Sequence, residues 1–260
     1  MSVKQEYANL SPLQTRIKIH SEYSERQDDV EEAVYHVIRP SLSDSLLDVG
    51  CGTGSFLKRL RAWGVGGELV ALDSSDAAVS AVAALGVADA VCADATRLPF
   101  SDGWFGILTA RHMLYHVEEP DTALHEFARV LRPGGRVAVS VNHARTVPLT
   151  TELVFAAMEE AGAHPVSSAA HVSSDDLAHR MTAVFHDVQS ERFDNALVFD
   201  QPAPLIAFAR ALLGIYGLHP DDERHSEAAA GIGRRAERWF ADHQGPLRDP
   251  KGYTICHGRA

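Results

Sequence analysis

The residues most able to do chemistry follow a short apolar run. Residues 46–49 contain one acid, Asp48, and the glycines Gly50, Gly52 and Gly54 follow at alternate positions. The apolar run predicts a strand. Alternating glycines predict a tight turn, because glycine adopts positive φ angles and has no Cβ to obstruct a bound molecule. We therefore expect a ligand to lie across the carboxyl end of this strand.

The charge of this turn bears on which ligand it binds. A dinucleotide-binding turn has the pattern G-x-G-x-x-G, and counting from Gly50 its last position falls on Ser55. The Asp48 carboxylate repels a pyrophosphate and attracts an amino group or a sulfonium. A second apolar run ends at Asp73, about 20 residues past the glycines, where a carboxylate can accept hydrogen bonds from ribose hydroxyls. The expected ligand is cationic at one end and carries a ribose.

Four ordered motifs resemble those of the class I S-adenosylmethionine (SAM) dependent methyltransferases. Residues 48–54 are similar to the first motif of that family, and Asp73 is similar to its ribose acid. Residues 93–100 resemble the adenine segment, and residues 131–135 resemble the turn into the fifth strand. The resemblance covers residues 45–141 and is strongest to enzymes of the ubiquinone and menaquinone biosynthesis type. It implies SAM as the cofactor and S-adenosylhomocysteine as its product.

The resemblance also implies which residues contact the cofactor. Asp48 and the glycine turn are expected to contact the methionine end of SAM, and Asp73 is expected to contact its ribose. The alternative for each acid is a structural role as a turn or helix-cap residue. Asp94 is expected to accept from the adenine amino group. The predicted cofactor-binding residues are Asp48, Gly50, Cys51, Gly52, Gly54, Asp73, Ser74, Asp94, Ala95, Arg111, Tyr23 and His20.

His20 and Tyr23 belong to this set because the N-terminal helices of related methyltransferases close over the cofactor. The alternative is that Tyr23 packs as a hydrophobic staple and that His20 is solvated.

A cluster of polar side chains follows the predicted fourth strand, at residues 111–116. Ligands of an open α/β sheet lie beyond the carboxyl ends of its strands, so this cluster and His143 should face one crevice. A neutral imidazole can remove a proton near pH 7. His112, His143 and His116 are therefore the predicted catalytic residues, although His116 also resembles a packing residue of the family. Arg111 is expected to pair with a substrate carboxylate or with an acid of the protein.

Several kinds of site are disfavoured. His112 and His116 share helical spacing but have no acid in a metal-binding pattern, so we predict no metal. Cys51, Cys92 and Cys256 form no C-x-x-C pair and are expected to be reduced structural thiols. A net charge of -11, from 24 basic and 35 acidic residues, disfavours nucleic acid as a substrate. The sequence shows no signal region and no apolar stretch of membrane-spanning length, so we expect a cytoplasmic protein without membrane contact.

Alternating strand and helix patterns predict a doubly wound, mostly parallel α/β sheet. The resemblance implies seven strands, a Rossmann-like order and a helical lid between strands five and six. A capping box at residues 24–27 predicts that a helix begins at Ser24 and ends before Pro40. Further helices are expected at residues 53–63, 75–85, 120–131, 149–161, 173–185, 203–213 and 220–240, and strands at 46–49, 68–73, up to 94, 104–110, 136–141, 188–199 and 253–256.

The expected organisation is one domain with insertions, since 260 residues with 45% hydrophobic content can bury one substantial core. Residues 1–40 should form N-terminal helices over the cofactor site, and residues 41–145 the SAM-binding core. Residues 146–186 should form the helical lid. Residues 187–260 should complete the core with closing antiparallel strands.

The sequence thus predicts a metal-independent methyltransferase that transfers a methyl group from SAM to oxygen, nitrogen or carbon of a small metabolite. Catalysis is expected by positioning, with a histidine as general base. One alternative is a SAM-binding protein of the same fold that does not methylate, either a cyclase or a regulatory subunit. Another is a nicotinamide dehydrogenase, against which Asp48 and Ser55 count. The oligomeric state is left open.

Overall fold

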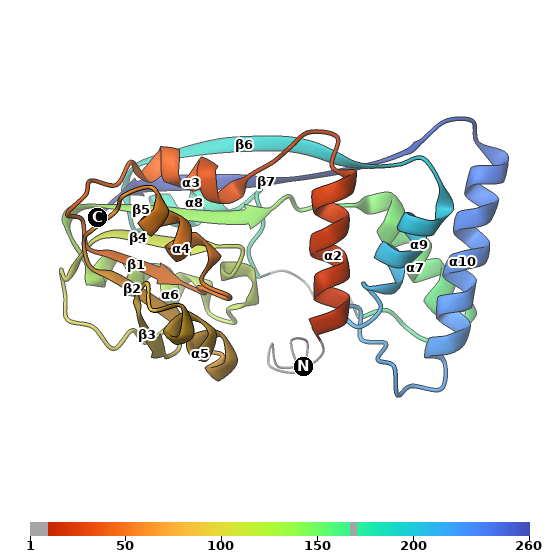
Figure 1. Cartoon of the computed structure of the whole chain (residues 1–260), viewed down its shortest axis with the longest axis horizontal. Coiled ribbons are helices and arrows are strands. Elements are labelled where there is room, and N and C mark those ends of the chain that lie inside the picture. Colours follow the sequence, from red (N-terminus) through yellow and green to blue (C-terminus); the bar gives the residue numbers. More distant parts are fainter. Residues whose placement is uncertain (1–9, 167–170) are drawn as a thin grey trace. The chain divides into compact units, whose positions relative to one another are not determined.

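The fold is described from a computed structural model, which places residues 10–166 and 171–260 (Figure 1). Residues 1–9 and 167–170, which belong to the predicted N-terminal segment and the predicted lid, lie outside the described residues. The chain divides into two compact units. Within the described residues, the sheet unit comprises residues 29–144, 171–193 and 253–260, and the helical unit comprises residues 10–28, 145–166 and 194–252.

Seven strands form one sheet in the order β3-β2-β1-β4-β5-β7-β6. Neighbouring strands from β3 to β5 run parallel, and β7 runs antiparallel to β5. The predicted mostly parallel sheet is therefore confirmed. The strand bounds are β1 (Leu46–Val49), β2 (Leu69–Asp73), β3 (Asp89–Cys92), β4 (Phe105–Arg111), β5 (Leu131–Asn142), β6 (His186–Phe199) and β7 (Leu247–Arg259).

The sheet unit is covered by helices on both faces because its strands are apolar on both faces. Leu46 and Leu47 point to opposite sides of β1, and both side chains are fully buried. One core cluster joins Leu46 to helices α3 (Val30–Ile38), α4 (Ser55–Ala62) and α5 (Asp76–Leu85). The other joins Leu47 to α6 (Pro120–Val130) and α8 (Leu177–Thr182). Strand order reverses between β1 and β4, which is where ligands of such sheets bind.

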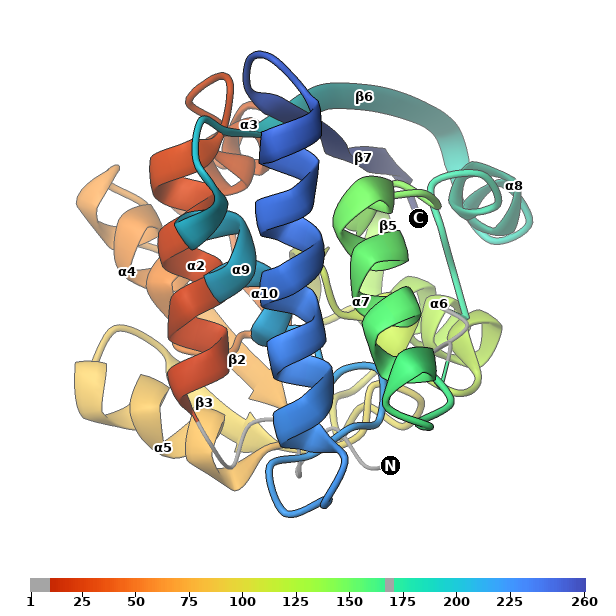
Figure 2. The same ribbon diagram turned by 90° about the vertical axis from the view of Figure 1, so that its right-hand side faces the viewer.

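The helical unit has a core of its own. It contains α2 (Leu10–Tyr23), α7 (Pro148–Glu160), α9 (Pro202–Arg210) and α10 (His225–Asp242). Helix α10 packs against α7 and α9, and α2 packs against α9 (Figure 2). Val154, Phe208 and Ile232 are among its buried core residues. Gly231 lets α10 approach α7 closely, since a Cβ at this position would lie 3.3 Å from the Cβ of Ala157.

Helix α3 begins later than the sequence predicted. Asp29 is its N-cap, and the Asp29 carboxylate accepts a hydrogen bond from the backbone N–H of Glu32 at 3.0 Å. Ser24 instead forms an isolated antiparallel bridge with Leu197. The predicted capping box at Ser24 was therefore wrong, because an acid five residues later caps the helix and Ser24 pairs with a strand.

Helix α8 is shorter than the predicted helix at residues 173–185. The Asp176 carboxylate accepts from the backbone N–H and the hydroxyl of Ser173, which holds residues 173–176 in a turn before the helix begins. Three further elements differ at one end: β5 begins at Leu131 rather than at 136, β7 at Leu247 rather than at 253, and α10 at His225 rather than at 220. The remaining predicted elements lie within a few residues of their observed bounds. No helix among the described residues is both long enough and apolar enough to span a membrane.

Strands β6 and β7 lie side by side and run antiparallel. His186 lies against Gly258, and the thiol of Cys256 lies 3.5 Å from the hydroxyl of Ser190. The ring of Phe193 stacks on that of Tyr253. Across these contacts the residue number increases along β6 and decreases along β7. This is the antiparallel arrangement expected for the closing strands.

Candidate functional site

The turn after β1 uses most of its backbone N–H groups within the protein. Gly50, Gly52 and Gly54 have φ angles of 69°, 54° and 76°. The N–H groups of Gly50 and Cys51 both donate to the carbonyl of Leu72, at 2.7 and 3.1 Å, and that of Gly54 donates to Cys51. These bonds tie β1 to β2. Few backbone N–H groups of the turn are therefore left to bind a ligand. The turn instead provides room for one.

The three glycines of the turn differ in what surrounds them. A Cβ on Gly50 would lie 2.6 Å from the Cβ of Met113, and a Cβ on Gly54 would lie 2.9 Å from Val82. No atom lies within 4 Å of the corresponding position on Gly52. Gly52 thus marks the open surface of the turn, while the other two glycines allow close packing.

Asp73 borders this open surface at the end of β2. Its Oδ2 accepts from the Gly52 N–H and its Oδ1 accepts from the Ser75 N–H, each at 3.0 Å. These two bonds fix the carboxylate beside the bare Cα of Gly52 while leaving it half-exposed. A carboxylate held in this way can still accept hydrogen bonds from a bound hydroxyl pair, because each oxygen has a second lone pair. Ser74, the next residue, is exposed.

Asp94 follows β3 at the same edge of the sheet. Its Oδ1 accepts from the backbone N–H and the hydroxyl of Thr96, at 2.8 and 2.7 Å. These bonds hold the pKa of the Asp94 carboxyl below its usual value, so the group stays ionised. Among the described residues, none donates to Oδ2. Ala95 is buried.

Asp48 is fully buried, and both of its carboxylate oxygens have partners. Oδ1 accepts from the hydroxyl of Thr109 at 2.8 Å, and Oδ2 lies 2.8 Å from Nη2 of Arg111. Arg111 also lies 3.5 Å from Glu31, with its guanidinium 4.3 Å above the ring of Phe56. Of the two pairings expected for Arg111, the structure shows the one with an acid of the protein.

The edge of the sheet around the turn is nevertheless acidic. Arg59 pairs with Asp29 at 2.7 Å and with Glu31 at 3.1 Å. The hydrogen bond from Arg59 lowers the pKa of the Asp29 carboxyl. Within the described residues, Asp29, Glu31 and Asp48 pair with Arg59 and Arg111, while Asp73 forms no ion pair. The negative charge of this edge therefore comes from several acids rather than from an open Asp48 carboxylate.

His112 directly follows β4 in the left-handed region, with a φ of 50°. Its N–H donates to the carbonyl of Ser140 in β5 at 2.9 Å. Its ring lies 5.8 Å, edge-on, from the ring of Tyr253 and 6.5 Å from that of Tyr115. A non-glycine residue in this conformation carries strain, which is often found at functional sites.

His143 is buried and held at both ring nitrogens. Nε2 lies 3.0 Å from the carbonyl of Tyr253 and must donate to it, which leaves Nδ1 as the acceptor facing Arg192 at 3.4 Å. This geometry sets one tautomer of the ring and places the Arg192 guanidinium against the lone pair that a base needs. His116 is exposed in the short 3-10 helix η1 (Leu114–His116), with its ring 4.5 Å from that of Tyr115.

His20 and Tyr23 lie on α2 in the helical unit. His20 packs edge-on against Phe208, at 5.4 Å, with its Nδ1 3.3 Å from Nζ of Lys251. Burial, followed by Lys251 and Arg16, lowers the pKa of His20 to about 4. The ring of Tyr23 lies 5.6 Å from that of Phe199. His20 is therefore not the solvated residue of the alternative reading, and its contact with a cofactor stays a prediction.

Sequence reasoning missed three residues of this site. Thr109 pairs in register with Asp48 and faces the same side as Arg111, a pattern that strand alternation could have revealed. Glu31 and Tyr253 come from other elements and carry no local motif. No group of three potential metal ligands occurs in the described part of the chain, and no disulfide joins the three cysteines.

Residues 47–139 match the protein family described as a methyltransferase domain. The chain contains a methyltransferase domain. The resemblance found in the sequence is thereby confirmed. The methyltransferase GfsG of Streptomyces halstedii is 34% identical over 123 residues, 45% of this chain and 44% of GfsG. A demethylmenaquinone methyltransferase of Mycolicibacterium vanbaalenii is 40% identical over 107 residues, 41% of this chain and 46% of that enzyme. The chain thus spans less than half the length of these relatives.

Solved structures support the class I methyltransferase fold over most of the chain. The [4+2]-cyclase SpnF matches with a TM-score of 0.60, covering 96% of this chain and 93% of SpnF at 20% identity. A putative methyltransferase of Bacillus halodurans also matches with a TM-score of 0.60, at 17% identity, covering 88% of this chain and 98% of that protein.

Proposed function

We propose that the chain is a metal-independent, SAM-dependent methyltransferase acting on a small molecule. The observation that carries this proposal is the pairing of a bare surface at Gly52 with the fixed carboxylate of Asp73. A nucleoside can lie on the first and hydrogen-bond to the second. The excess of acids around the turn favours a cationic ligand over a pyrophosphate.

The residues at this edge fit the cofactor. Asp73 accepts from the ribose hydroxyls, and Asp94 accepts from the adenine amino group through the oxygen that Thr96 does not occupy. The cofactor supplies a methyl group on a sulfonium, which is already activated for in-line transfer. The protein therefore has to place the acceptor and exclude water.

Arg111 is assigned to the methionine end. Asp48 and Glu31 hold its guanidinium from two sides, and the side chain is only 10% exposed. The role of Asp48 is then to fix Arg111, since both of its carboxylate oxygens are already engaged. A preorganised guanidinium can bind a carboxylate without reorganising at the moment of binding.

His112 is the best candidate for a general base among the three predicted histidines. The ring of His143 is committed at both nitrogens, and His116 is exposed. His112 lies between β4 and the aromatic rings of Tyr115 and Tyr253. In this role its imidazole accepts a proton from a hydroxyl or amine acceptor and holds it while the methyl group transfers.

The acceptor is a small molecule rather than nucleic acid, because a net charge of -11 opposes a phosphate-contacting surface. The relatives include a demethylmenaquinone methyltransferase, so demethylmenaquinone is a rational first acceptor to assay.

Incubation with methyl-labelled SAM and a panel of small-molecule acceptors tests the proposal. Calorimetric titration with S-adenosylhomocysteine should accompany it. Binding together with label transfer supports a methyltransferase. Binding with intact SAM after exhaustive incubation supports the alternative, a cyclase or regulatory protein of the same fold. Absence of binding refutes both.

A further inference from the structure

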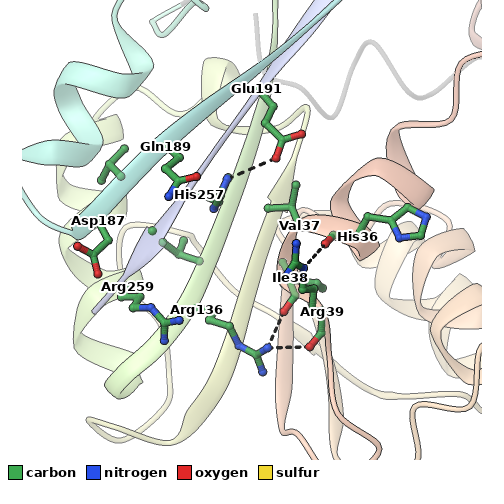
Figure 3. A pocket seen from close by; sticks show the side chains of 13 residues that line it. His36, Val37, Ile38, Arg39, Arg136, Asp187, Gln189, Glu191, His257 and Arg259 are labelled. Carbon is green, nitrogen blue, oxygen red and sulfur yellow. Dashed lines mark hydrogen bonds and ion pairs between the residues drawn. The ribbon is translucent and has the colours of Figure 1, made fainter.

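A cavity of about 710 Å³ lies in the sheet unit, away from the glycine turn. Its walls are the C-terminal end of α3 and parts of β5, β6 and β7 (Figure 3). Arg136 is the first residue of β5 that pairs with β7, and Asn142 is the last. The cavity therefore lies toward the amino end of β5, whereas Gly50 follows the carboxyl end of β1. Neither the proposed cofactor contacts nor the predicted bases line it.

Two arginines of this cavity are direct cross-strand neighbours. Arg136 and Arg259 are paired in the register of β5 and β7, so their side chains share one face of the sheet. Two positive charges placed directly opposite each other destabilise a sheet unless an anion compensates them. The pairing of Arg136 with Arg259 therefore lowers the stability of the sheet through charge repulsion.

Only one of these two charges is compensated within the protein. Nη2 of Arg136 lies 2.5 Å from the Asp44 carboxylate, and Nη1 donates to the carbonyls of Ile38 and Arg39 at 2.7 Å each. Arg259 forms no ion pair with any described residue, and its side chain carries no dashed contact in Figure 3. The guanidinium of Arg259 is therefore available to a ligand.

Arg39 adds a third guanidinium from the end of α3. This residue is the C-cap of the helix and has a φ of 44°. Glycine or asparagine usually occupies positions with this left-handed conformation. Its guanidinium donates to the carbonyl of His36 at 3.3 Å and makes no ion pair within residues 10–166 or 171–260. An arginine at this strained position places a positive charge at the rim of the cavity.

The opposite wall, from β6, is acidic and polar. Glu191 lies 3.6 Å from Nε2 of His257, while Asp187 and Gln189 have no side-chain partner among the described residues. These acids repel an anion, which is therefore expected beside the arginines. The side-chain oxygens on the β6 wall can accept hydrogen bonds from hydroxyl or amino groups of a ligand. The cavity volume lies within the range of small-molecule sites.

We propose that this cavity binds a phosphate monoester that also carries hydroxyl groups, with Arg39 and Arg259 contacting the phosphate. Arg136 holds the end of α3 through the carbonyls of Ile38 and Arg39. The site is separate from the proposed methyl-transfer site and does not depend on the proposed function. Guanidinium groups match the geometry of phosphate oxygens through paired hydrogen bonds.

Calorimetric titration with ribose 5-phosphate, ribose and inorganic phosphate at physiological ionic strength tests the proposal. Ribose 5-phosphate should bind most tightly, inorganic phosphate more weakly, and ribose not at all. Arg39→Ala and Arg259→Ala should each weaken ribose 5-phosphate binding about ten-fold or more. Arg238→Ala removes the same charge from an exposed site on α10 and should leave binding unchanged. Affinity for S-adenosylhomocysteine should be the same in all three variants.

Three results would overturn the proposal. The first is no binding of ribose 5-phosphate to the unmodified protein. The second is equal binding of ribose and ribose 5-phosphate, because the phosphate would then contribute nothing. The third is a loss in Arg238→Ala as large as in the cavity variants, because binding would then follow overall charge rather than this cavity.

Discussion

Asp48 and Asp73 stand at the ends of neighbouring strands but have opposite surroundings. Asp48 is fully buried and bound by Thr109 and Arg111. Asp73 is half-exposed and bound by two backbone N–H groups beside an open surface. The two acids therefore differ in what surrounds them: Asp48 is engaged inside the protein, and Asp73 borders the open surface at Gly52.

Removal of the Asp73 carboxylate should weaken cofactor binding. Asp73→Ala is expected to reduce the affinity for S-adenosylhomocysteine by about 1 to 3 kcal/mol, because the ribose hydroxyls lose a charged acceptor. Calorimetry measures the change. Asp76→Ala removes an exposed acid from the first turn of α5 and serves as the matched control. Equal affinities in the two variants would place the ribose elsewhere.

Removal of Arg111 should destabilise the fold. Arg111→Met leaves the fully buried Asp48 carboxylate without its ionic partner and should lower the free energy of unfolding by about 3 kcal/mol. Urea denaturation measures this change. The double variant Asp48→Asn with Arg111→Met should lose less than the sum of the single changes. Strict additivity would show that the two side chains are not coupled.

At the scale of elements, the glycine turn separates packing from ligand access. Gly50→Ala should destabilise the protein by about 2 kcal/mol or more, because it combines a positive φ with an overlap against Met113. Gly52→Ala meets no atom of the protein, so its cost should be only the backbone strain of about 1 kcal/mol. Affinity for S-adenosylhomocysteine should nevertheless fall sharply in Gly52→Ala. Urea denaturation and calorimetry on the same variants measure the two effects. Normal S-adenosylhomocysteine binding by Gly52→Ala would show that this glycine is not needed for ligand access.

The start of α7 is held by a distant acid. Val147 is its N-cap residue and provides no side-chain hydrogen bond. The buried Asp249 accepts instead from the N–H groups of Leu149 and Thr150 at 3.0 and 2.8 Å, and from the Thr150 hydroxyl at 2.6 Å. Asp249→Ala should cost about 2 kcal/mol of unfolding free energy. Asp242→Ala, at an exposed position on α10, should cost little, and similar losses in both would contradict the capping role.

The elements around the turn could be predicted because their signals are local. Helices α5 and α6 begin at Asp76 and Pro120, where helices were predicted from residues 75 and 120. Strand alternation places Thr109 and Arg111 on one side of β4, but their pairing with Asp48 could not be predicted, since it joins strands more than 60 residues apart. Glu31, which pairs with Arg111, lies on another element, α3. Their approach depends on strand register and helix packing, which no local pattern encodes.

At the scale of the whole molecule, the chain has two units, each with buried clusters of its own. The predicted boundaries at residues 40, 145 and 186 divide the chain into segments that are each continuous in sequence. The two units instead combine segments that are distant in sequence, because β6 and β7 each contribute residues to both. Covering of the cofactor site by residues 1–40, and a lid role for residues 146–186, stay predictions.

Acid should destabilise the protein through His20. Its pKa is lowered from 6.5 to about 4, chiefly by burial, then by Lys251 and Arg16, with Asp28 acting in the opposite direction. A lowered pKa means that the unfolded chain takes up the proton first. The stabilisation is therefore complete above pH 6.5 and is lost as the pH falls toward 4, by about 3 kcal/mol at most.

Urea denaturation across this pH range checks the effect. The free energy of unfolding of His20→Gln should depend less on pH between 6.5 and 4 than that of the unmodified protein. His164→Gln replaces an exposed histidine and should keep the unmodified pH dependence. Parallel curves for all three proteins would rule out His20 as the source of the acid sensitivity.

We expect the acidic edge after β1 and β2 to bind a nucleoside with a cationic end and not a dinucleotide. Calorimetric titrations of the unmodified protein with S-adenosylmethionine and, separately, with NAD⁺ compare the two ligands. One-to-one binding of S-adenosylmethionine is expected, with no detectable binding of NAD⁺. Binding of NAD⁺ without binding of S-adenosylmethionine would show that the edge selects a dinucleotide.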